Sequence, residues 1–296
     1  MRPGRAKDLA GVLDLWRQDV RAGRRDSVPG DDRMHRMLAG FDWEASSRIM
    51  DRPGGGLEGA VLVSSRPAPT GTIAIVEASA AEDRPDVLSE LTRWGLGLSK
   101  AAGSATALVW RGRGHSDGLD RLGLEFVRPW WRMDRSLASE PAAAAAVPGY
   151  ELHDARSIPT GRWVEAHNLS FADHWRFTPR TEEELMVGRP ADLSLMAVTP
   201  GGVPAALTLS QVEHYQADSR PQPVGIVSSV GTLPDHRRRG LATWLVAEAL
   251  IRLHRAGARH TSLYVDGRSP MQAFEVYSKL GFRLAFETEV WEARFQ

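Results

Sequence analysis

The stretch HRRRGLAT, residues 236–243, decides the fold because of the segments on either side of it. Upstream, residues 224–230 (VGIVSSV) are short, apolar and rich in β-branched side chains, which predicts a strand that ends before Pro234. Downstream, apolar residues recur at helical spacing from Ala242 to Leu253. The sequence therefore predicts a strand, a basic loop and a helix that begins near Gly240.

The chemistry of this loop makes it a candidate pyrophosphate site. The free N–H groups and the positive dipole end of a helix N-terminus favour an anion. A glycine lets a phosphate approach the backbone, and arginines add forked donors. The pattern Arg237-x-x-Gly240-x-Ala242 is short, however, and a solvated basic turn has the same letters.

A second motif follows in the same half of the chain. Residues 261–265 (TSLYV) predict another strand, and residues 269–282 read SPMQAFEVYSKLGF. Ser269 and Pro270 predict an N-cap and the first residue of a helix that ends near Gly281. With the loop at 236–243, this helix resembles the signature of the GNAT superfamily, the acetyl-CoA-dependent N-acetyltransferases. Ser269 stands where that family often has Asn.

The resemblance implies an α/β fold with mixed sheets and acetyl-CoA as cosubstrate, without a metal. Backbone groups of Val230, Gly231 and Thr232 would pair with the pantetheine arm, and amides of residues 238–243 would hold the pyrophosphate. Tyr277 would protonate the departing thiolate, which suits a phenol with a pKa of about 10. The coenzyme contacts implied are those of Val230, Gly231, Thr232, Arg237, Arg238, Arg239, Gly240, Leu241, Ala242, Thr243, Ser269 and Tyr277.

The general base and the acceptor site have weaker signals. Residues 225–232 contain no carboxylate, so Glu213, at the end of the preceding strand, is the candidate base, with His214 as an alternative. Both also fit ordinary polar residues at a strand end. In this family the first helices line the acceptor cleft, which makes Asp173, His174 and Trp175 candidate substrate contacts. The alternative is that Trp175 belongs to the core and the other two are solvated.

The length of 296 residues predicts two domains. Residues 138–148 (ASEPAAAAAVP) are typical of a linker, which separates a first domain at 1–137 from an acetyl-CoA-binding domain at 149–296. The first half repeats the predicted order of helices and strands of the second, although few letters match. This arrangement resembles the tandem two-domain acetyltransferases of the mycothiol synthase type.

The first domain is predicted to be degenerate. At the place of the pyrophosphate loop it has AAEDRPDV, residues 80–87, which lacks glycine. Glu82, Asp83 and Asp86 in this segment would repel phosphate. Leu119 stands where the second half has Tyr277. We therefore expect the first domain to act as structure beside the catalytic domain.

Composition excludes several function classes. Lys+Arg and Asp+Glu number 37 each, so the net charge of zero argues against nucleic-acid or anionic-membrane partners. The absence of cysteine excludes disulfides and a cysteine nucleophile, and the nine histidines show no metal-ligand spacing. Without a long apolar run or a signal peptide, a cytoplasmic location is expected.

The sequence thus predicts direct transfer of an acetyl group from acetyl-CoA to a primary amine of a small molecule. One alternative is a non-catalytic acyl-CoA-binding sensor or interaction module, which the missing strand carboxylate favours. Another is an acetyltransferase for protein N-termini or lysines, which an open acceptor groove would favour. The intact motif around Tyr277 opposes the first alternative, and a closed acceptor pocket would favour a small amine over the second.

Overall fold

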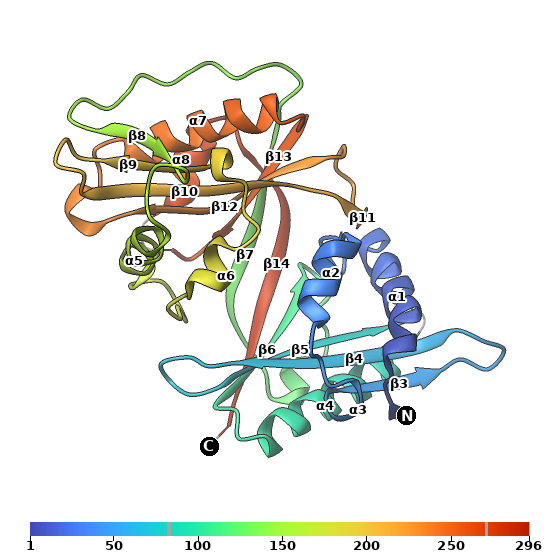
Figure 1. The fold of residues 1–296 in the computed structure, drawn as a ribbon. Coiled ribbons are helices and arrows are strands. Elements are labelled where there is room, and N and C mark those ends of the chain that lie inside the picture. The colour runs from blue at the N-terminus through green and yellow to red at the C-terminus, as the bar shows by residue number, and fades with distance from the viewer. Residues whose placement is uncertain (82–83, 270–271, 296) are drawn as a thin grey trace. The chain divides into compact units, whose positions relative to one another are not determined.

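Helices and strands alternate along the chain in the computed structural model, which describes residues 1–81, 84–269 and 272–295 (Figure 1). The chain forms two compact units that are discontinuous in sequence. Unit 1 consists of Met1–Trp130, Tyr215–Ser219 and Phe286–Gln296, and unit 2 consists of Trp131–His214 and Arg220–Ala285.

The sheet of unit 1 has a helix on each face. Its strands follow the order β1-β3-β4-β5-β6-β14. Alternate residues of β4 point to opposite faces: Val61 packs in the same cluster as Leu91 of α4, whereas Leu62 packs with Trp16 of α1. The elements are β1 (Arg2–Pro3), α1 (Leu9–Arg21), β2 (Val28–Pro29), α2 (Asp31–Leu38), α3 (Trp43–Ser46), β3 (Ser47–Asp51), β4 (Leu57–Arg66), β5 (Ile73–Ala80), α4 (Pro85–Ala101), β6 (Thr106–Gly112), β11 (Tyr215–Ala217), the first part of β7 (Glu125–Ser136) and most of β14 (Arg283–Arg294).

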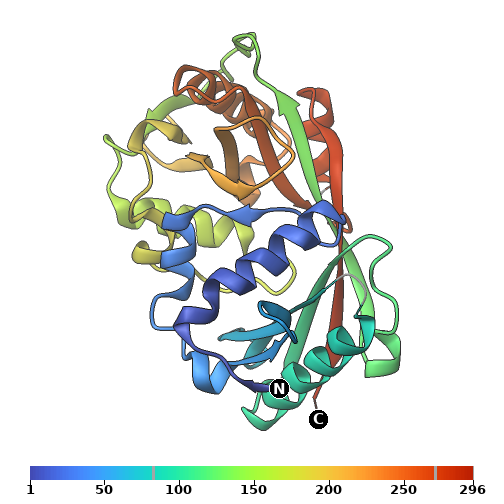
Figure 2. The ribbon, with the colours of Figure 1, turned by 90° about the vertical axis from the view of Figure 1, so that its right-hand side faces the viewer.

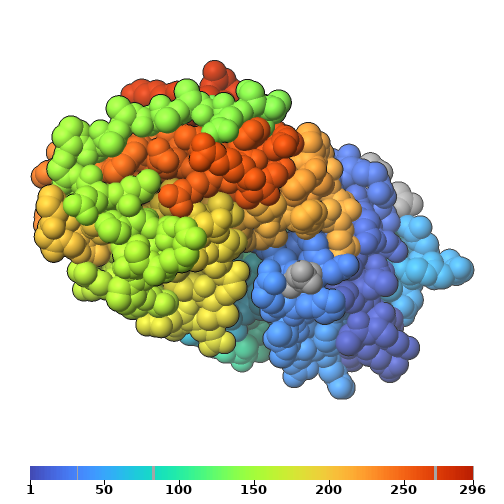
Figure 3. Space-filling model, turned by 45° about the horizontal axis from the view of Figure 1, so that its top comes forward, coloured from blue at the N-terminus to red at the C-terminus, as the bar shows by residue number. Residues whose placement is uncertain are grey.

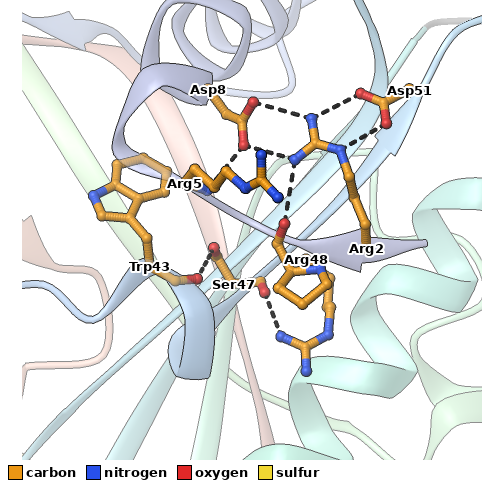
Figure 4. Close-up of polar contacts among 8 residues, drawn as sticks. Arg2, Arg5, Asp8, Trp43, Ser47, Arg48 and Asp51 are labelled. Carbon is orange, nitrogen blue, oxygen red and sulfur yellow. Dashed lines mark hydrogen bonds and ion pairs between the residues drawn. The ribbon is translucent and has the colours of Figure 1, made fainter.

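An ion-pair cluster ties the N-terminal strand of unit 1 to its neighbours (Figure 4). The guanidinium of Arg2 donates to Asp8 at 2.8 Å and to Asp51 at 2.7 Å. The hydrogen bonds from Arg2 hold the pKa of the Asp8 carboxyl below its usual range. Arg2 therefore joins β1 to the start of α1 and the end of β3.

Unit 2 repeats this architecture, with strands in the order β7-β13-β12-β10-β9-β8. Leu195 of β9 packs in one cluster with Leu245 of α7, and Met196 packs in another with Trp163 of α5. The two helices therefore cover opposite faces of the sheet (Figures 1 and 2). The elements are β8 (Glu151–Asp154), α5 (Thr160–Phe171), α6 (Glu182–Met186), β9 (Ser194–Val198), β10 (Pro204–Glu213), β12 (Val224–Thr232), α7 (Leu241–Arg255), β13 (His260–Asp266) and α8 (Ala273–Lys279).

Strand pairing explains why the compact units differ from the predicted division at 1–137 and 149–296. The last strand, β14, pairs antiparallel with β6, from Thr288↔Gly112 to Arg294↔Thr106. Residues 286–294 therefore complete the sheet of unit 1. In the other direction, residues 131–136 of β7 belong to unit 2, where β7 neighbours β13. Each half of the sequence thus supplies a strand segment to the other unit.

The predicted linker at 138–148 contains no helix or strand, but it packs along α7. Ala144 and Val147 contact the apolar cluster that includes Leu245. At the other end of the helix, Glu140 forms an ion pair with Arg255 at 2.6 Å. Figure 3 shows this green segment beside the orange helix. Within the described ranges, no helix is long and apolar enough to cross a membrane.

Candidate functional site

The strands β12 and β13 of unit 2 separate halfway along β12. They pair in parallel from Val224↔His260 to Val227↔Leu263, and no later pair is described although both strands continue. On its other side β12 stays paired with β10 as far as Thr232. Residues 228–232 therefore present one backbone edge to an extended ligand, which could bind there as a strand does. Val230, Gly231 and Thr232 all lie in this segment.

The loop after β12 leads into the N-terminus of a helix, as the sequence predicts for residues 236–243. Arg238 and Gly240 have left-handed backbones, with φ of 60° and 86°, and α7 begins at Leu241. The first helical hydrogen bond runs from the Trp244 N–H to the Gly240 carbonyl at 3.0 Å. The N–H groups of Leu241, Ala242 and Thr243 therefore precede it and have no acceptor within the helix. They are free for an anion.

Arg237 anchors this loop. It donates to the Asp173 carboxylate at 2.8 Å, to the Ser170 carbonyl at 3.2 Å and to the Thr232 carbonyl at 3.2 Å. The hydrogen bonds from Arg237 hold the pKa of Asp173 below its usual range. Arg237 thus joins the end of β12 to α5. Asp173, predicted as an acceptor contact, is placed against this loop.

The other two arginines differ in their partners. Arg239 donates to the Tyr150 hydroxyl at 3.2 Å and to the Asp235 carbonyl at 3.0 Å. The Tyr150 hydroxyl also lies 2.9 Å from Nδ1 of His236. Arg238 is exposed and, in the part of the chain that the structure describes, makes no hydrogen bond or ion pair. Its guanidinium is the one that a phosphate can engage without breaking a contact.

Gly231 allows α5 to pack directly on the unpaired segment of β12. A Cβ added to it would lie 2.7 Å from the Ser170 side chain and 3.0 Å from the Phe171 ring. Any larger residue would push the strand and the helix apart. The end of α5 therefore borders the same segment as the predicted coenzyme contacts.

Tyr277 of α8 lies near the place where the strands separate. It packs in the cluster that contains Val227 and Leu263, the last paired residues of β12 and β13, with Val230 against its edge. Its ring meets Phe282 edge to face, with centroids 6.2 Å apart. Burial raises the pKa of the Tyr277 phenol well above its usual value. The phenol therefore keeps its proton at neutral pH.

The helix that carries Tyr277 begins later than predicted. Gln272 is its N-cap residue and Ala273 its first residue, so the N-cap predicted at Ser269 is wrong. Ser269 instead belongs to turns, since its N–H donates to Asp266 at 3.0 Å and its carbonyl accepts from Gln272 at 3.1 Å. Pro270, like Glu82 and Asp83 of the first half, lies outside the described residues.

Glu213, the predicted base, lies at the far end of the pairing. It faces Val224, the first residue of β12, and is buried. Since a strand rises about 3.3 Å per residue, roughly 20 Å of strand separates Val224 from Val230. Gln211 donates to the Glu213 carboxylate and accepts from Arg189 at 3.1 Å. These contacts link Glu213 to the middle of β12.

Arg189 is a site residue that the sequence analysis missed. It follows α6 and donates to the Ser228 hydroxyl at 2.8 Å, where the pairing between β12 and β13 has just ended. A single arginine outside any motif carries no signal of such a role. The contact can be recognised only once α6 and β12 are folded together.

His167 is a second residue without a sequence signal. It stacks on Phe171, with ring centroids 4.6 Å apart, and is almost fully buried. Burial, aided by the charges of Arg180 and Arg189, lowers its pKa to about 4. His167 is therefore neutral at pH 7, beside the helix end that packs on Gly231.

The two remaining predicted acceptor contacts lie just beyond α5. His174 is exposed as a whole residue, but its ring meets Phe171 edge to face with centroids 4.6 Å apart, and this partial loss of solvent around the ring lowers its pKa. Trp175 is partly buried, with the Arg176 guanidinium 5.7 Å from its ring. No group of three residues that could hold a metal ion occurs among the described residues.

Sequence comparison relates the chain to known acetyltransferases. Residues 210–291 match the model of the FR47-like protein family. The chain is 30% identical over 193 residues to a mycothiol acetyltransferase of Kytococcus sedentarius, covering 60% of this chain and 62% of the relative. It is 32% identical over 196 residues to the enzyme of that name from Nocardia farcinica, covering 62% of each chain. The matches thus span less than two thirds of these relatives.

Solved structures match nearly the whole chain. A GCN5-related N-acetyltransferase from Sphaerobacter thermophilus has a TM-score of 0.80 at 20% identity, covering 99% of this chain and 94% of that one. A tandem GNAT protein from the clavulanic acid biosynthesis pathway has a TM-score of 0.71 at 17% identity, covering 99% and 97%. The tandem GNAT fold predicted from residues 236–243 and 269–282 is confirmed.

Proposed function

From this tandem GNAT fold we propose that the chain transfers an acetyl group from acetyl-CoA to a primary amine of a small molecule, and that unit 2 catalyses the reaction. The observation that carries the proposal is the combination of the unpaired β12 segment with the helix N-terminus that follows it. Relatives named mycothiol acetyltransferase support the same reaction class.

The coenzyme would bind through backbone and charge. The pantetheine arm would pair with residues 228–232, and the pyrophosphate would accept from the amides of residues 238–243 and from Arg238. Ser269 lies in the turns that lead to α8 and would contact the coenzyme from there. Arg237 and Arg239 would hold the loop in place without leaving their own partners.

In the reaction a C–N bond forms, a C–S bond breaks, the amine loses one proton and the sulfur gains one. The amine attacks the thioester carbonyl, a C–N bond forms, and the C–S bond breaks as the sulfur takes a proton. Tyr277 would give that proton. Burial raises the pKa of its phenol, which makes it a weaker acid, but a thiolate that forms in the same buried place is also poorly solvated and is therefore a stronger base. Binding both substrates side by side would supply much of the rate.

The proton that the attacking amine loses would pass to Glu213 through water. The carboxylate is buried and connected through Gln211 and Arg189 to Ser228 at the middle of β12. Neither an amide nor a guanidinium accepts a proton readily, so a water chain beside them is required. Asp173, His174 and Trp175 remain the proposed acceptor side, next to the end of α5.

The direct test is release of free thiol from acetyl-CoA in the presence of a panel of amines. The panel contains small primary amines, the acceptor of the mycothiol acetyltransferases, and peptides with free N-termini or lysines. Turnover with small amines alone supports the proposal, and turnover with peptides alone replaces it with protein acetylation. Coenzyme binding without turnover on any amine would favour an acyl-CoA-binding module.

The Tyr277→Phe variant tests the acid. We expect kcat to fall about 100-fold, a typical contribution of general acid catalysis, with coenzyme affinity little changed. The phenyl ring keeps the packing against Phe282, so loss of the fold is not expected. Wild-type kcat in this variant would exclude Tyr277 as the acid.

A further inference from the structure

Arg111 of unit 1 is a buried cation without a carboxylate partner among the described residues. It lies near the end of β6 and is 8% exposed. Its Nη1 donates to the Trp110 carbonyl at 3.1 Å, while Nη2 is buried and has no hydrogen-bond partner. A buried donor that is left unsatisfied costs free energy, and a charged one costs more. An acceptor brought by a ligand would satisfy this donor.

Two further arginines follow α1 and add to this charge. Arg24 donates to Asp19 at 2.6 Å, and Arg25 donates to Glu77 at 2.7 Å. Each still has one buried nitrogen without a partner in the described part of the chain, Nη2 of Arg24 and Nε of Arg25. Arg25 also lies over the Trp16 ring, 3.9 Å from its centroid.

The charges of this cluster do not cancel. The cluster formed by Arg111, Arg24, Arg25, Asp19 and Glu77 has three guanidinium groups and two carboxylates, which is one positive charge in excess. Burial is the main reason that the pKa of Arg111 is lowered to about 10, a net value in which Asp19 and Glu77 act to raise it and Arg25 and Arg24 act to lower it. Arg111 still carries its proton at neutral pH, so the excess charge persists.

The cluster lies where two strands of unit 1 have separated. The parallel pairs of β5 and β6 end at Ile75↔Leu108, and both Glu77 and Arg111 lie beyond that pair. In sheet order this is the place that the unpaired segment of β12 occupies in unit 2. Unit 1 therefore has charged side chains where unit 2 has a free backbone edge.

The segment that carries Arg24 is fixed in position. The Gly112 N–H donates to the Arg24 carbonyl at 2.9 Å. A Cβ on Gly112 would lie 2.0 Å from the Gly23 carbonyl oxygen, so only glycine permits this approach. The donors around Arg111 are thus held in place before any ligand arrives, which lowers the entropy cost of binding.

We propose that unit 1 binds a small oxyanion, a carboxylate or a phosphate group, at Arg111, with Arg24 and Arg25 adding positive potential. A guanidinium fork matches the paired oxygens of such a group. One negative charge on the ligand balances the excess charge of the cluster. This site lies outside the proposed catalytic site and does not depend on it.

The test uses the Arg238→Glu protein as host, because that change removes anion binding at the loop of unit 2. We expect phosphate or acetate, at constant ionic strength, to raise the Tm of the host by about 2 °C or more over chloride. A rise in Tm with phosphate identifies the ligand group as a phosphate, and a rise with acetate identifies it as a carboxylate. Equal Tm values in phosphate, acetate and chloride would overturn the proposal.

Two variants in this host locate the effect. Arg111→Met should abolish the anion-dependent shift, whereas Arg121→Met, which removes an exposed arginine of the same unit, should retain it. If the shift survives Arg111→Met, the site is not at Arg111. Should that variant fail to fold, an anomalous difference map of host crystals soaked in selenate decides, because a peak at Arg111 Nη2 is expected and its absence contradicts the site.

Discussion

Arg237, Arg238 and Arg239 are chemically identical, but the structure gives them different tasks. Arg237 has three acceptors, from β12, from α5 and from Asp173 just beyond α5, and Arg239 has two. Arg238 has a left-handed backbone and an exposed side chain. A residue in that conformation is strained unless the loop requires it. The guanidinium of Arg238 is exposed and, among the described residues, has no partner that a phosphate would have to displace.

Arg238→Glu should therefore remove most of the rise in Tm that acetyl-CoA gives the wild-type protein. The change replaces a cation beside a pyrophosphate by an anion and breaks no contact within the protein. Differential scanning fluorimetry with and without coenzyme measures the shift. Arg121→Glu, which makes the same change of charge at an exposed position of unit 1, is the control. An undiminished shift in Arg238→Glu would contradict the pyrophosphate assignment.

His167 predicts how stability depends on pH. Its folded pKa of about 4 lies below the ordinary value of 6.5, so between these values the unfolded state binds more protons. Stability that is present above pH 6.5 is thus lost as the pH falls toward 4. Relative to His167→Phe, which does not titrate, the wild type should lose about 2 kcal/mol of unfolding free energy between pH 7 and pH 4.5.

Urea denaturation of both proteins at the two pH values measures this difference. His174, whose pKa is also lowered, is present in both proteins and its effect cancels. Phenylalanine keeps a ring that can stack on Phe171, so the comparison isolates the charge. An equal loss of stability in the two proteins would show that His167 is not buried in its neutral form.

At the scale of helices and strands, the segments whose apolar residues recur at a regular spacing were predictable from sequence. The strand at 224–230, the helix that follows Gly240 and the strand at 261–265 are confirmed, with ends that differ by a few residues. Each of these elements buries an apolar face, and the spacing of apolar residues in the sequence shows that face directly. The start of α8 was wrong because Ser269-Pro270 favours a helix start, while the described chain forms turns there and caps the helix with Gln272.

The segment at 138–150 shows what composition does not reveal. Its alanines and prolines are typical of a flexible linker, yet Val147 packs on the cluster under α7 and Tyr150 holds the loop through His236 and Arg239. The contacts join residues 86 and 89 positions apart. No local pattern predicts such pairs, since they depend on where β8 places the chain.

Tyr150→Phe should lower the affinity for acetyl-CoA with little effect on kcat. The hydroxyl joins His236 to Arg239, and its loss removes about 1 kcal/mol of hydrogen bonding from the loop, which corresponds to roughly 5-fold in Kd. Calorimetric titration gives the Kd and a thiol-release assay gives kcat. A lowered kcat at unchanged Kd would place Tyr150 in the chemistry and contradict its role in holding the loop.

For the whole molecule, the repeat was predictable but the exchange of strands was not. The two halves share an order of elements that the sequence displays, and this gives the tandem fold. Which strand completes which sheet depends on the pairing of β14 with β6 over residues 288–294. Each half of the sequence has a strand at the corresponding position, and the residue pattern of these strands does not show which partner strand each will pair with.

The tandem fold also predicts how many coenzymes one chain binds. In unit 2 the separated strands lead to Gly240 and a helix N-terminus, whereas in unit 1 α4 begins with Pro85 and Asp86, and Arg111 lies where the strands separate. We therefore expect calorimetric titration with acetyl-CoA to give one site per chain. Arg238→Glu should remove that single binding heat, and Arg111→Met should leave it intact. Two sites, or a heat that disappears with Arg111→Met, would mean that unit 1 also binds the coenzyme.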